Sequence, residues 1–381
     1  MLLNYNLTEE QNDIVRLARN FAKNEMIPLA EYYDESEKHP EEIVKKAWEV
    51  GLMNLSIPEE YGGPGLEFFT YCLVNEELCW GCAGITTIFN ANTLANLPII
   101  IGGSDEQKRK FLTPFTKAPI LSAFGLTEPN SGSDAGAMHS IARLEGDYYV
   151  INGSKCFITN GAVASQFVIF ASVDRSKGAK GVTAFVVPSD TPGISCGKKE
   201  KKLGIRASVT SEIIMENLRV PKENLLLGEG KGMRLALGTL NKARISVASG
   251  AVGVSRRAFE EALAYSKQRV QFGKPICELQ AIQHMLADMA ISIQAMRDLY
   301  WRAAWMASND LPCQKESAIC KAFNTEVGFK VVNTGLQIFG GYGYIREYPM
   351  EKLLRDIRIM TIVDGTTQIQ KNILAGLLLN E

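Results

Sequence analysis

Residues 148–187, YYVINGSKCFITNGAVASQFVIFASVDRSKGAKGVTAFVV, decide the fold of this 381-residue chain. Three runs in this stretch are rich in β-branched and aromatic residues: Tyr148–Ile151, Phe167–Val173 and Val182–Val187. Such runs, separated by turn residues like Glu145-Gly146-Asp147 and Asn152-Gly153, predict strands joined by tight turns. The stretch therefore predicts an antiparallel β-domain.

Helical periodicity surrounds this stretch on both sides. Before it, Thr8 and Gln11 form a capping-box pattern, and Ser104 and Gln107 repeat the pattern at a second helix start. Beyond residue 231, apolar residues at helical spacing predict three long helices, over residues 233–268, 277–309 and 314–338. We therefore predict an α+β chain of three domains: an N-terminal helical domain (1–118), a central antiparallel β-domain (119–227) and a C-terminal helical bundle (228–381).

Composition and charge restrict the class of protein. The chain has 41 Lys and Arg against 42 Asp and Glu, which gives a formal charge of −1, and 46% of its residues are hydrophobic. These values indicate a globular protein and exclude disordered and collagen-like classes. Because a surface without net charge does not attract phosphate backbones or anionic lipid, we expect neither nucleic acid nor a membrane as a partner.

Two segments bear on the cellular location. Residues 1–6 lack the basic and apolar regions of a signal peptide, which favours a cytoplasmic protein with reduced cysteines. The most apolar stretch, Ala83 to Gly103, contains three asparagines and Pro98, which the hydrocarbon core of a bilayer disfavours. We therefore expect this stretch to form a buried helix.

Cys79-Trp80-Gly81-Cys82 is a CxxC motif, a pattern found in zinc and redox sites. A zinc site needs four ligands, and the sequence offers neither a second CxxC nor a histidine at a suitable spacing. The pair also falls late in a helical run, where two small core side chains are a sufficient explanation. Since nucleotide-binding glycine loops and hydrolase or metalloprotease motifs are also absent, we expect a cofactor that is held in another way.

Three polar segments are candidates for a binding site. Residues 129–134 (PNSGSD) form a predicted turn rich in backbone and hydroxyl donors, which suits a phosphate, an isoalloxazine edge or a plain loop. Residues 157–161 (FITNG) place an aromatic and a hydroxyl group before a hairpin-type Asn-Gly. In residues 364–368 (DGTTQ) an acid precedes a predicted helix start, and the pattern alone favours an N-cap role for Asp364 over a catalytic one.

Five motifs in sequence order resemble those of the acyl-CoA dehydrogenase family, the FAD-dependent dehydrogenases of acyl-CoA thioesters. They are Leu126-Thr127-Glu128-Pro129 with Gly132-Ser133-Asp134, Ile158-Thr159-Asn160-Gly161, Arg269 with Phe272-Gly273, Gln337 with Gly340-Gly341 and Gly343, and Gly365-Thr366 with Gln368-Ile369-Gln370. The resemblance extends over the whole chain, and the medium-chain and short-chain branches are the most similar. It implies the family's fold: a helical domain, an antiparallel β-domain and a C-terminal four-helix bundle.

The resemblance also implies a cofactor and the residues that bind it. FAD would lie between the β-domain and the C-terminal bundle of an obligatory oligomer, which is usually a homotetramer in this family. Its contacts would come from Phe124, Leu126, Thr127, Ser133, Phe157, Thr159, Arg269, Phe272, Gln280, Gln337, Gly340, Gly341, Thr366 and Gln368. The residues from Arg269 to Gly341 in this list would contact the FAD of a neighbouring subunit. Thr366 and Gln368 would hold the pyrophosphate of the FAD at a helix start. The acyl-CoA would contact Ser133, Leu240, Asn241, Arg244 and Gly365.

The mechanism implied by the resemblance needs a base. A carboxylate removes the α-proton of the thioester while the carbonyl oxygen is polarised, and flavin N5 accepts a hydride from the β-carbon. Asp364 matches the position of this base, and Ala243 stands where another branch of the family carries it. Burial beside flavin and thioester would raise the pKa of the Asp364 carboxyl group toward neutrality.

Departures from the family's pattern bear on the substrate. The usual base is a glutamate after a tyrosine, whereas this chain has Val363-Asp364, and Phe157 replaces a common tryptophan. One methylene less withdraws the carboxylate by roughly 1.5 Å, for which a bulkier α-carbon would compensate. We therefore expect an α-branched or cyclic acyl group such as that of cyclohexanecarboxyl-CoA. No Lys or Arg lies between Trp80 and Gln107, which disfavours a dicarboxyl-CoA. Asn90 in this segment is a candidate for the acyl pocket, but an amide that packs between helices is the safer interpretation.

Other functions stay open on the sequence alone. The electron acceptor implied by the resemblance is an electron-transfer flavoprotein. The alternative to a cyclic or branched substrate is an acyl-CoA with a straight short or medium chain. The same residues would also serve an enoyl-CoA reductase that works in the reverse direction. A paralogue that binds FAD or acyl-CoA without turnover is disfavoured, because an acid is retained at position 364 together with the matched cofactor positions.

Overall fold

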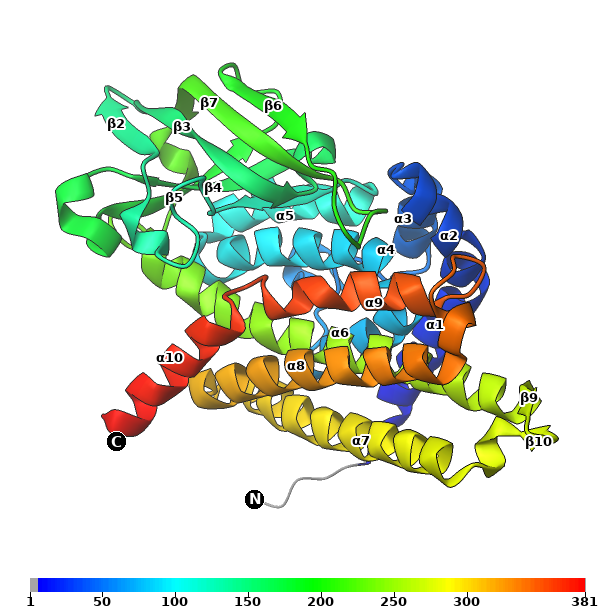
Figure 1. Cartoon of the computed structure of the whole chain (residues 1–381). Helices are drawn as coiled ribbons and strands as arrows, with labels where there is room; N and C mark the ends of the chain where they lie inside the picture. Colours follow the sequence, from blue (N-terminus) through cyan, green and yellow to red (C-terminus); the bar gives the residue numbers. More distant parts are fainter. Residues whose placement is uncertain (1–5, 381) are drawn as a thin grey trace.

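The structure, a computed structural model, describes residues 6–380. Residues 1–5, on which most of the signal-peptide prediction rests, lie outside the described residues, as does residue 381. Figure 1 shows a β-sheet on one side of a stack of long helices, with the N-terminal helices beside them. The order along the chain is helices, strands and helices, as the periodicity of the sequence predicts.

The N-terminal helices begin where the predicted caps lie. α1 (Glu9–Phe21) starts after Thr8 and α5 (Asp105–Lys117) after Ser104, and in both the cap side chain and the glutamine three residues later complete a capping box. Between them lie a π-helical turn (Ala22–Met26), α2 (Ile27–Ser36), α3 (Glu41–Glu49) and α4 (Phe68–Gly102). Both predicted capping boxes are therefore confirmed.

α4 contains the apolar stretch that we expected to be buried. The helix is long and apolar enough to cross a membrane by length and composition alone, but 72% of its most apolar window is buried inside the protein. α4 is kinked at Cys82, whose backbone angles are non-helical (φ −162°, ψ 111°). Cys79 and Cys82 are buried free thiols, and residues 6–380 contain no cluster of three His, Cys, Asp or Glu side chains that could hold a metal ion. The buried helix is thus confirmed, and the CxxC pair belongs to the packed core.

Eight strands form the central sheet: β1 (Ser122–Gly125), β2 (Ile141–Glu145), β3 (Tyr148–Thr159), β4 (Gln166–Ser172), β5 (Val182–Pro188), β6 (Ile194–Lys199), β7 (Thr210–Pro221) and β8 (Leu225–Leu226). Their order is β6-β7-β3-β2-β4-β5-β8, with β1 beside β4. Neighbouring strands are antiparallel, except that β1 runs parallel to β4 and that β2 meets β4 in one parallel pair. The three predicted strands correspond to β3, β4 and β5.

The turn predicted at Asn152-Gly153 is wrong. β3 continues through both residues, and its register against β7 shifts between Ile151 and Gly153, as in a β-bulge. Gly153 has a φ of +145°, and a Cβ atom there would lie 2.4 Å from Ser140 Oγ. The glycine therefore permits a close contact inside the sheet rather than a reversal of the chain.

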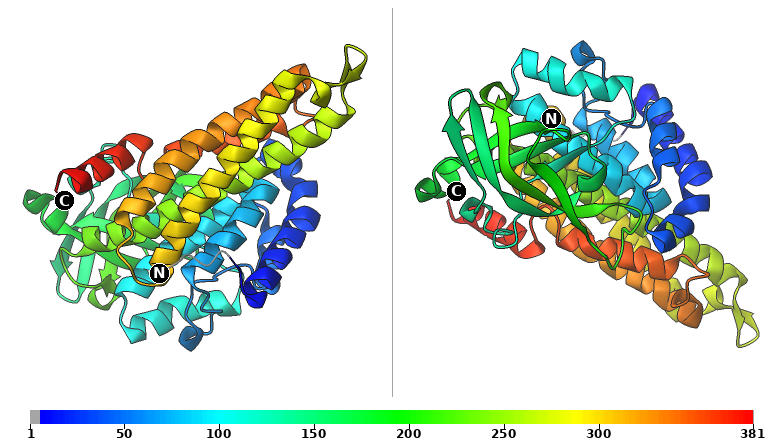
Figure 2. Two further views of the ribbon diagram at one scale, coloured as in Figure 1. Left: turned by 90° about the horizontal axis from the view of Figure 1, so that it is seen from below. Right: turned by 90° about the horizontal axis from the view of Figure 1, so that it is seen from above.

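Three long helices dominate the C-terminal part, as predicted: α6 (Gly232–Gln268), α7 (Gln280–Ser308) and α8 (Gln314–Phe339). A hairpin of β9 (Val270–Gln271) and β10 (Lys274–Pro275) joins α6 to α7, and α9 (Met350–Arg358) and α10 (Thr367–Leu379) end the chain. Figures 1 and 2 show the hairpin at one end of the long helices and α10 toward the other end.

The N-terminal and C-terminal helices share one hydrophobic core. Buried side chains from α1, α4, α6, α7 and α8 belong to the same apolar cluster. α4 and α6 approach so closely that a Cβ atom at Gly253 would lie 2.1 Å from the carbonyl oxygen of Glu76. This shared core fixes α4 and α6 relative to the segment after α9, and these three parts of the chain surround the cavity described next.

Candidate active site

A cavity of about 130 Å³ lies between α4, α6 and the segment that follows α9. Its walls are mostly apolar, and they also carry hydroxyl, amide and thiol groups, the amine of Lys242 and one carboxyl group. The lining includes Phe68, Tyr71, Cys79, Thr87, Asn90, Leu94, Thr159, Lys242, Ser246, Gly250, Met360, Val363 and Asp364. The Tyr71 hydroxyl donates to Asn90 Oδ1 (2.9 Å) and lies 3.1 Å from Ser246 Oγ. Asn90 thus lines the cavity and also packs against Tyr71, and its part in binding an acyl group stays a prediction.

Asp364 is the one carboxylic acid among the residues that line this cavity. It is not the N-cap of α10, because that position belongs to Thr366, whose hydroxyl accepts a hydrogen bond from Ile369 N (3.3 Å). The N-cap interpretation of Asp364 is therefore wrong. Burial raises the pKa of the Asp364 carboxyl group, and Lys321 and Arg244 act in the opposite direction. A carboxyl group with a raised pKa beside an apolar cavity is suited to general base catalysis.

The turn that carries Asp364 has an unusual backbone. Asp364 and Gly365 both have positive φ angles, +54° and +90°. The carbonyl oxygen of Asp364 accepts from Arg244 Nε (3.2 Å), and that of Gly365 accepts from Gln370 Nε2 and Lys321 Nζ (both 2.8 Å). Because positive φ in a non-glycine residue costs energy, it persists where the surroundings enforce it. These bonds therefore fix the direction of the Asp364 side chain.

Arg244 has a different environment from that of a surface cation. Only 3% of its surface is exposed, and Nη1 donates to Asn241 Oδ1 (2.8 Å). Burial lowers the pKa of its guanidinium group, and Asp364 opposes that shift. Arg244 thus links Asn241, on the same helix, to the turn that carries Asp364 and Gly365. Leu240 precedes Asn241 on α6. Their binding to acyl-CoA stays a prediction.

A second group of predicted residues lies at the edge of the sheet. Phe124 is in β1, Leu126 and Thr127 follow it, and Phe157 and Thr159 end β3. The Thr127 carbonyl oxygen accepts from a β3 backbone N–H (3.0 Å), so the two segments adjoin, and Thr159 also lines the cavity. Phe157 is 66% exposed and has a φ of +58°. The hydroxyl groups of Thr127 and Thr159 form no hydrogen bond with any of residues 6–380. An exposed ring beside free hydroxyl groups fits a flat polar heterocycle such as a flavin. Ser133 lies exposed in the loop after β1.

The remaining cofactor candidates fall into two places. The first place is the β9–β10 hairpin with the adjacent helix ends, at the end of the long helices opposite α10 (Figure 1). It holds Arg269, Phe272, Gln280, Gln337, Gly340 and Gly341. Phe272 is 90% exposed there, beside a cavity of about 610 Å³. Thr366 and Gln368 lie instead at the start of α10. One chain therefore keeps the two sets apart, and the contact of the first set with a neighbour's FAD stays a prediction.

Three residues of this site were not identified from the sequence: Tyr71, Ser246 and Lys321. Tyr71 and Ser246 lie on α4 and α6, about 175 positions apart, and meet only in the folded chain. Lys321 is fully buried in α8. The one signal for it is a lysine in an otherwise apolar helical run, AICKAF, where a charged residue is rare unless it has a partner.

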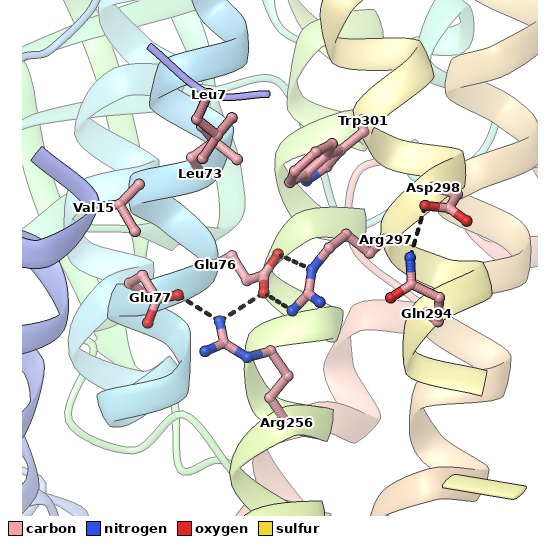
Figure 3. Close-up of a pocket in the computed structure, with 10 residues that line it drawn as sticks. All are labelled: Leu7, Val15, Leu73, Glu76, Glu77, Arg256, Gln294, Arg297, Asp298 and Trp301. Carbon is pink, nitrogen blue, oxygen red and sulfur yellow. Dashed lines mark hydrogen bonds and ion pairs between the residues drawn. The ribbon is translucent and has the colours of Figure 1, made fainter. Parts of the chain in front are cut away.

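Another cavity, of about 700 Å³, lies between α1, α4, α6 and α7 (Figure 3). Glu76 at its base contacts Arg256 Nη1 (2.7 Å), Arg297 Nη2 (2.6 Å) and the Tyr300 hydroxyl. Burial alone would raise the pKa of Glu76, but the two guanidinium groups hold it below its ordinary value. Because these charges pair with one another, we place the active site in the smaller cavity.

Helices, an antiparallel β-domain and further helices, with one carboxylic acid in an apolar cavity, agree with the layout that the resemblance to flavin-dependent thioester dehydrogenases implies. The chain belongs to the acyl-CoA dehydrogenase family. The family's N-terminal domain matches residues 8–118, its middle domain residues 123–218 and its C-terminal domain residues 230–379. The predicted family and fold are thus confirmed, and the enzyme is an FAD-dependent oxidoreductase acting on CH–CH bonds.

The chain is also similar to individual members over its full length. It is 44% identical to the acyl-CoA dehydrogenase, short-chain specific, of Clostridium acetobutylicum, covering 98% of this chain and 99% of that one. The butyryl-CoA dehydrogenase from Megasphaera elsdenii superposes with a TM-score of 0.97 at 40% identity, covering 99% and 100% of the two chains. A chain in a structure of the electron transferring flavoprotein of Acidaminococcus fermentans has the same TM-score at 41% identity and full coverage of both chains.

Proposed function

We propose that this enzyme oxidises a cyclic or α-branched acyl-CoA, with cyclohexanecarboxyl-CoA as the example, to the 2-enoyl-CoA. The observation that carries the proposal is Asp364, a short acid on a turn that hydrogen bonds hold in place. Because the turn is held, a backbone shift does not readily bring the carboxylate to a slim substrate, whereas a wide α-carbon approaches it more closely. A cavity of about 130 Å³ also suits a compact acyl group better than a long chain.

The chain itself supplies the proton chemistry. Asp364 takes the proton from the α-carbon, and the raised pKa of its carboxyl group lets it retain that proton. Phe68, Leu94 and Met360 in the cavity wall keep water away from the reacting carbons. The chemistry that bound FAD would supply is an acceptor for the hydride that leaves the β-carbon.

A straight short-chain acyl-CoA is the second candidate substrate. The similarity to the short-chain specific enzyme of C. acetobutylicum and to butyryl-CoA dehydrogenase favours it, and the cavity also accommodates a small straight chain. Under either substrate we propose an electron-transfer flavoprotein as the acceptor, a proposal supported by the likeness to the A. fermentans structure. Reduction of the enoyl-CoA would use the same residues in reverse, and the retained acid disfavours a subunit that binds without turnover.

An anaerobic spectral screen tests this proposal. The purified enzyme is mixed with cyclohexanecarboxyl-CoA, isobutyryl-CoA, butyryl-CoA and octanoyl-CoA, and loss of the flavin absorbance reports oxidation of each substrate. We expect the fastest bleaching with the cyclic or branched thioester. Faster bleaching by butyryl-CoA would favour the second candidate, and a flavin that no acyl-CoA reduces would favour a binding subunit.

We predict that the purified protein is yellow, holds about one FAD per chain without a covalent bond, and forms an oligomer, for which we propose a homotetramer. The reason is that Arg269, directly after α6, lies 25 residues and therefore roughly 37 Å along the helix from Arg244, which contacts the Asp364 turn. We therefore propose that the candidate residues around β9–β10 contact the FAD of a neighbouring chain. Light scattering measures the oligomeric state, and the FAD released on denaturation gives the number of FAD molecules per chain. A folded, colourless monomer obtained with ample FAD would contradict the prediction.

We predict that Arg244→Ala weakens acyl-CoA binding and leaves FAD bound. A charge-assisted contact contributes about 1.5–3 kcal/mol, so KM should rise by roughly 10- to 150-fold. Steady-state kinetics and the FAD content separate the two effects. Since Arg244 also donates to the Asp364 carbonyl oxygen, a fall in kcat at unchanged KM would assign it to the turn instead of the substrate.

A further inference from the structure

Lys321 in α8 is a buried cation without a close anionic partner. None of its surface is exposed. Within residues 6–380 its Nζ forms no ion pair and donates one hydrogen bond, to the Gly365 carbonyl oxygen at 2.8 Å. A buried ammonium group is costly unless an anion or several acceptors compensate for the loss of water. Its position therefore points to a partner that acts over a longer distance.

The hydrogen bond to Gly365 does not explain the charge. Gln370 Nε2 donates to the same carbonyl oxygen at the same distance, 2.8 Å. Gln370 is itself fully buried, and it also donates to the Asp364 carbonyl oxygen (3.3 Å). A neutral side chain thus already holds this turn, and the positive charge of Lys321 must have another role.

The charged groups around Lys321 identify its electrostatic partner. They are Asp364 on the turn, Arg244 from α6 and Glu326 from α8. Glu326 is partly exposed and lies 3.5 Å from Lys371 Nζ, so a surface lysine and water already compensate for its charge. Asp364 is the remaining anion, and on its side Lys321 and Arg244 are the two groups that favour the carboxylate. Burial lowers the pKa of Lys321 to about 8, which leaves the amine mostly charged at neutral pH.

We propose that Lys321 is a positioning residue whose charge keeps Asp364 ionised, and therefore able to accept a proton, before the substrate binds. This rests on the proposed role of Asp364 as the base. An opposite charge nearby lowers the pKa of a carboxyl group by about 1–3 units. Without Lys321, only Arg244 would oppose the effect of burial, and Asp364 would be protonated and inactive over a wider range of acidic pH.

The test compares Lys321→Met, Lys321→Gln and Lys321→Arg with Lys330→Gln, an exposed lysine on the same helix. kcat/KM for the best acyl-CoA of the screen is measured against pH, together with the FAD content. The acid limb is the part of the pH profile in which kcat/KM rises with pH as Asp364 becomes ionised. In the Met and Gln variants we expect this limb to move to higher pH by about one unit or more, so that kcat/KM at acidic pH falls about tenfold. At alkaline pH Asp364 is ionised in every variant, and the rates should converge. The Arg variant and the control should keep the wild-type acid limb.

Thermal unfolding provides a readout that does not depend on turnover. Lys321→Met is compared in the wild type and in the Asp364→Asn background, across pH. If the charge of Lys321 stabilises the carboxylate, Lys321→Met lowers Tm more when Asp364 is present. This difference should disappear at acidic pH, where Asp364 is protonated with or without Lys321.

The possible outcomes separate the two proposals. A purely structural role for Lys321 would lower Tm or FAD content in the Met and Gln variants with the acid limb unmoved, and this result would overturn the inference. Activity that survives in Asp364→Asn would instead remove the base assignment itself. An inactive Asp364→Asn together with an unmoved acid limb in the Lys321 variants leaves the base in place and rejects only the role of Lys321.

Discussion

Asp364→Asn should abolish the reduction of the flavin by acyl-CoA while the fold, the FAD and acyl-CoA binding remain. The amide has the shape of the carboxyl group but not its basicity, and a general base contributes about 10²- to 10⁴-fold to the rate. The backbone bonds that hold the turn end on carbonyl oxygens, so the substitution leaves them intact. Anaerobic stopped-flow measurement of flavin absorbance gives the rate.

The control for this experiment is the binding of substrate to the variant. An acyl-CoA that still perturbs the flavin spectrum without bleaching it shows that the site has formed and that only proton removal is lost. Because burial raises the pKa of Asp364, the wild-type rate should also rise with pH through the pKa of this group, as the base becomes ionised. Bleaching at a wild-type rate in Asp364→Asn would show that another group takes the proton.

Asp364→Glu should shift the preference of the enzyme from cyclic or α-branched toward straight-chain acyl-CoAs. The longer side chain extends the carboxylate by roughly 1.5 Å into a cavity of about 130 Å³. A slim substrate then comes within reach of the base, while a wide α-carbon collides with it. The measurement is kcat/KM for cyclohexanecarboxyl-CoA, isobutyryl-CoA, butyryl-CoA and octanoyl-CoA in the wild type and the variant.

The size of the preference decides this prediction. A change of tenfold in the ratio of two kcat/KM values corresponds to about 1.4 kcal/mol in the transition state. A wild type that prefers a straight chain by tenfold or more would refute the cyclic substrate and leave the catalytic role of Asp364 standing. A variant with the wild-type order of substrates would show that the length of the acid does not set the preference.

Local patterns in the sequence predict the elements of the fold well. The capping residues Thr8 and Ser104 mark helix starts because their side chains satisfy backbone N–H groups within three residues. Asn152-Gly153 misled the prediction because the same dipeptide suits a hairpin turn and a bulge, and only the partner strand β7 decides between them. The pairing of β1 with β4 is parallel and non-local, and no short-range pattern encodes it.

The candidate site shows the same limit more clearly. Asp364 can be proposed from its motif, but the pattern alone favoured a helix cap, since an acid before a glycine and a hydroxyl is typical of both. Lys321 approaches the Asp364 turn from a different helix, 43 positions earlier in the chain, so its role depends on tertiary packing. The domain limits and the cytoplasmic location stay predictions.

The length of α6 determines which active site a substitution would affect in the oligomer that we propose. This one helix extends from Gly232 to Gln268, so that Arg244 beside Asp364 and Arg269 directly after the helix are 25 residues and therefore roughly 37 Å apart along its axis. A substitution in the β9–β10 hairpin would leave the base of its own chain intact and impair the FAD site of the neighbouring chain that the hairpin contacts. In a mixed oligomer of two variants, one changed at the base and the other at the hairpin, one site would then combine an intact base with an intact hairpin.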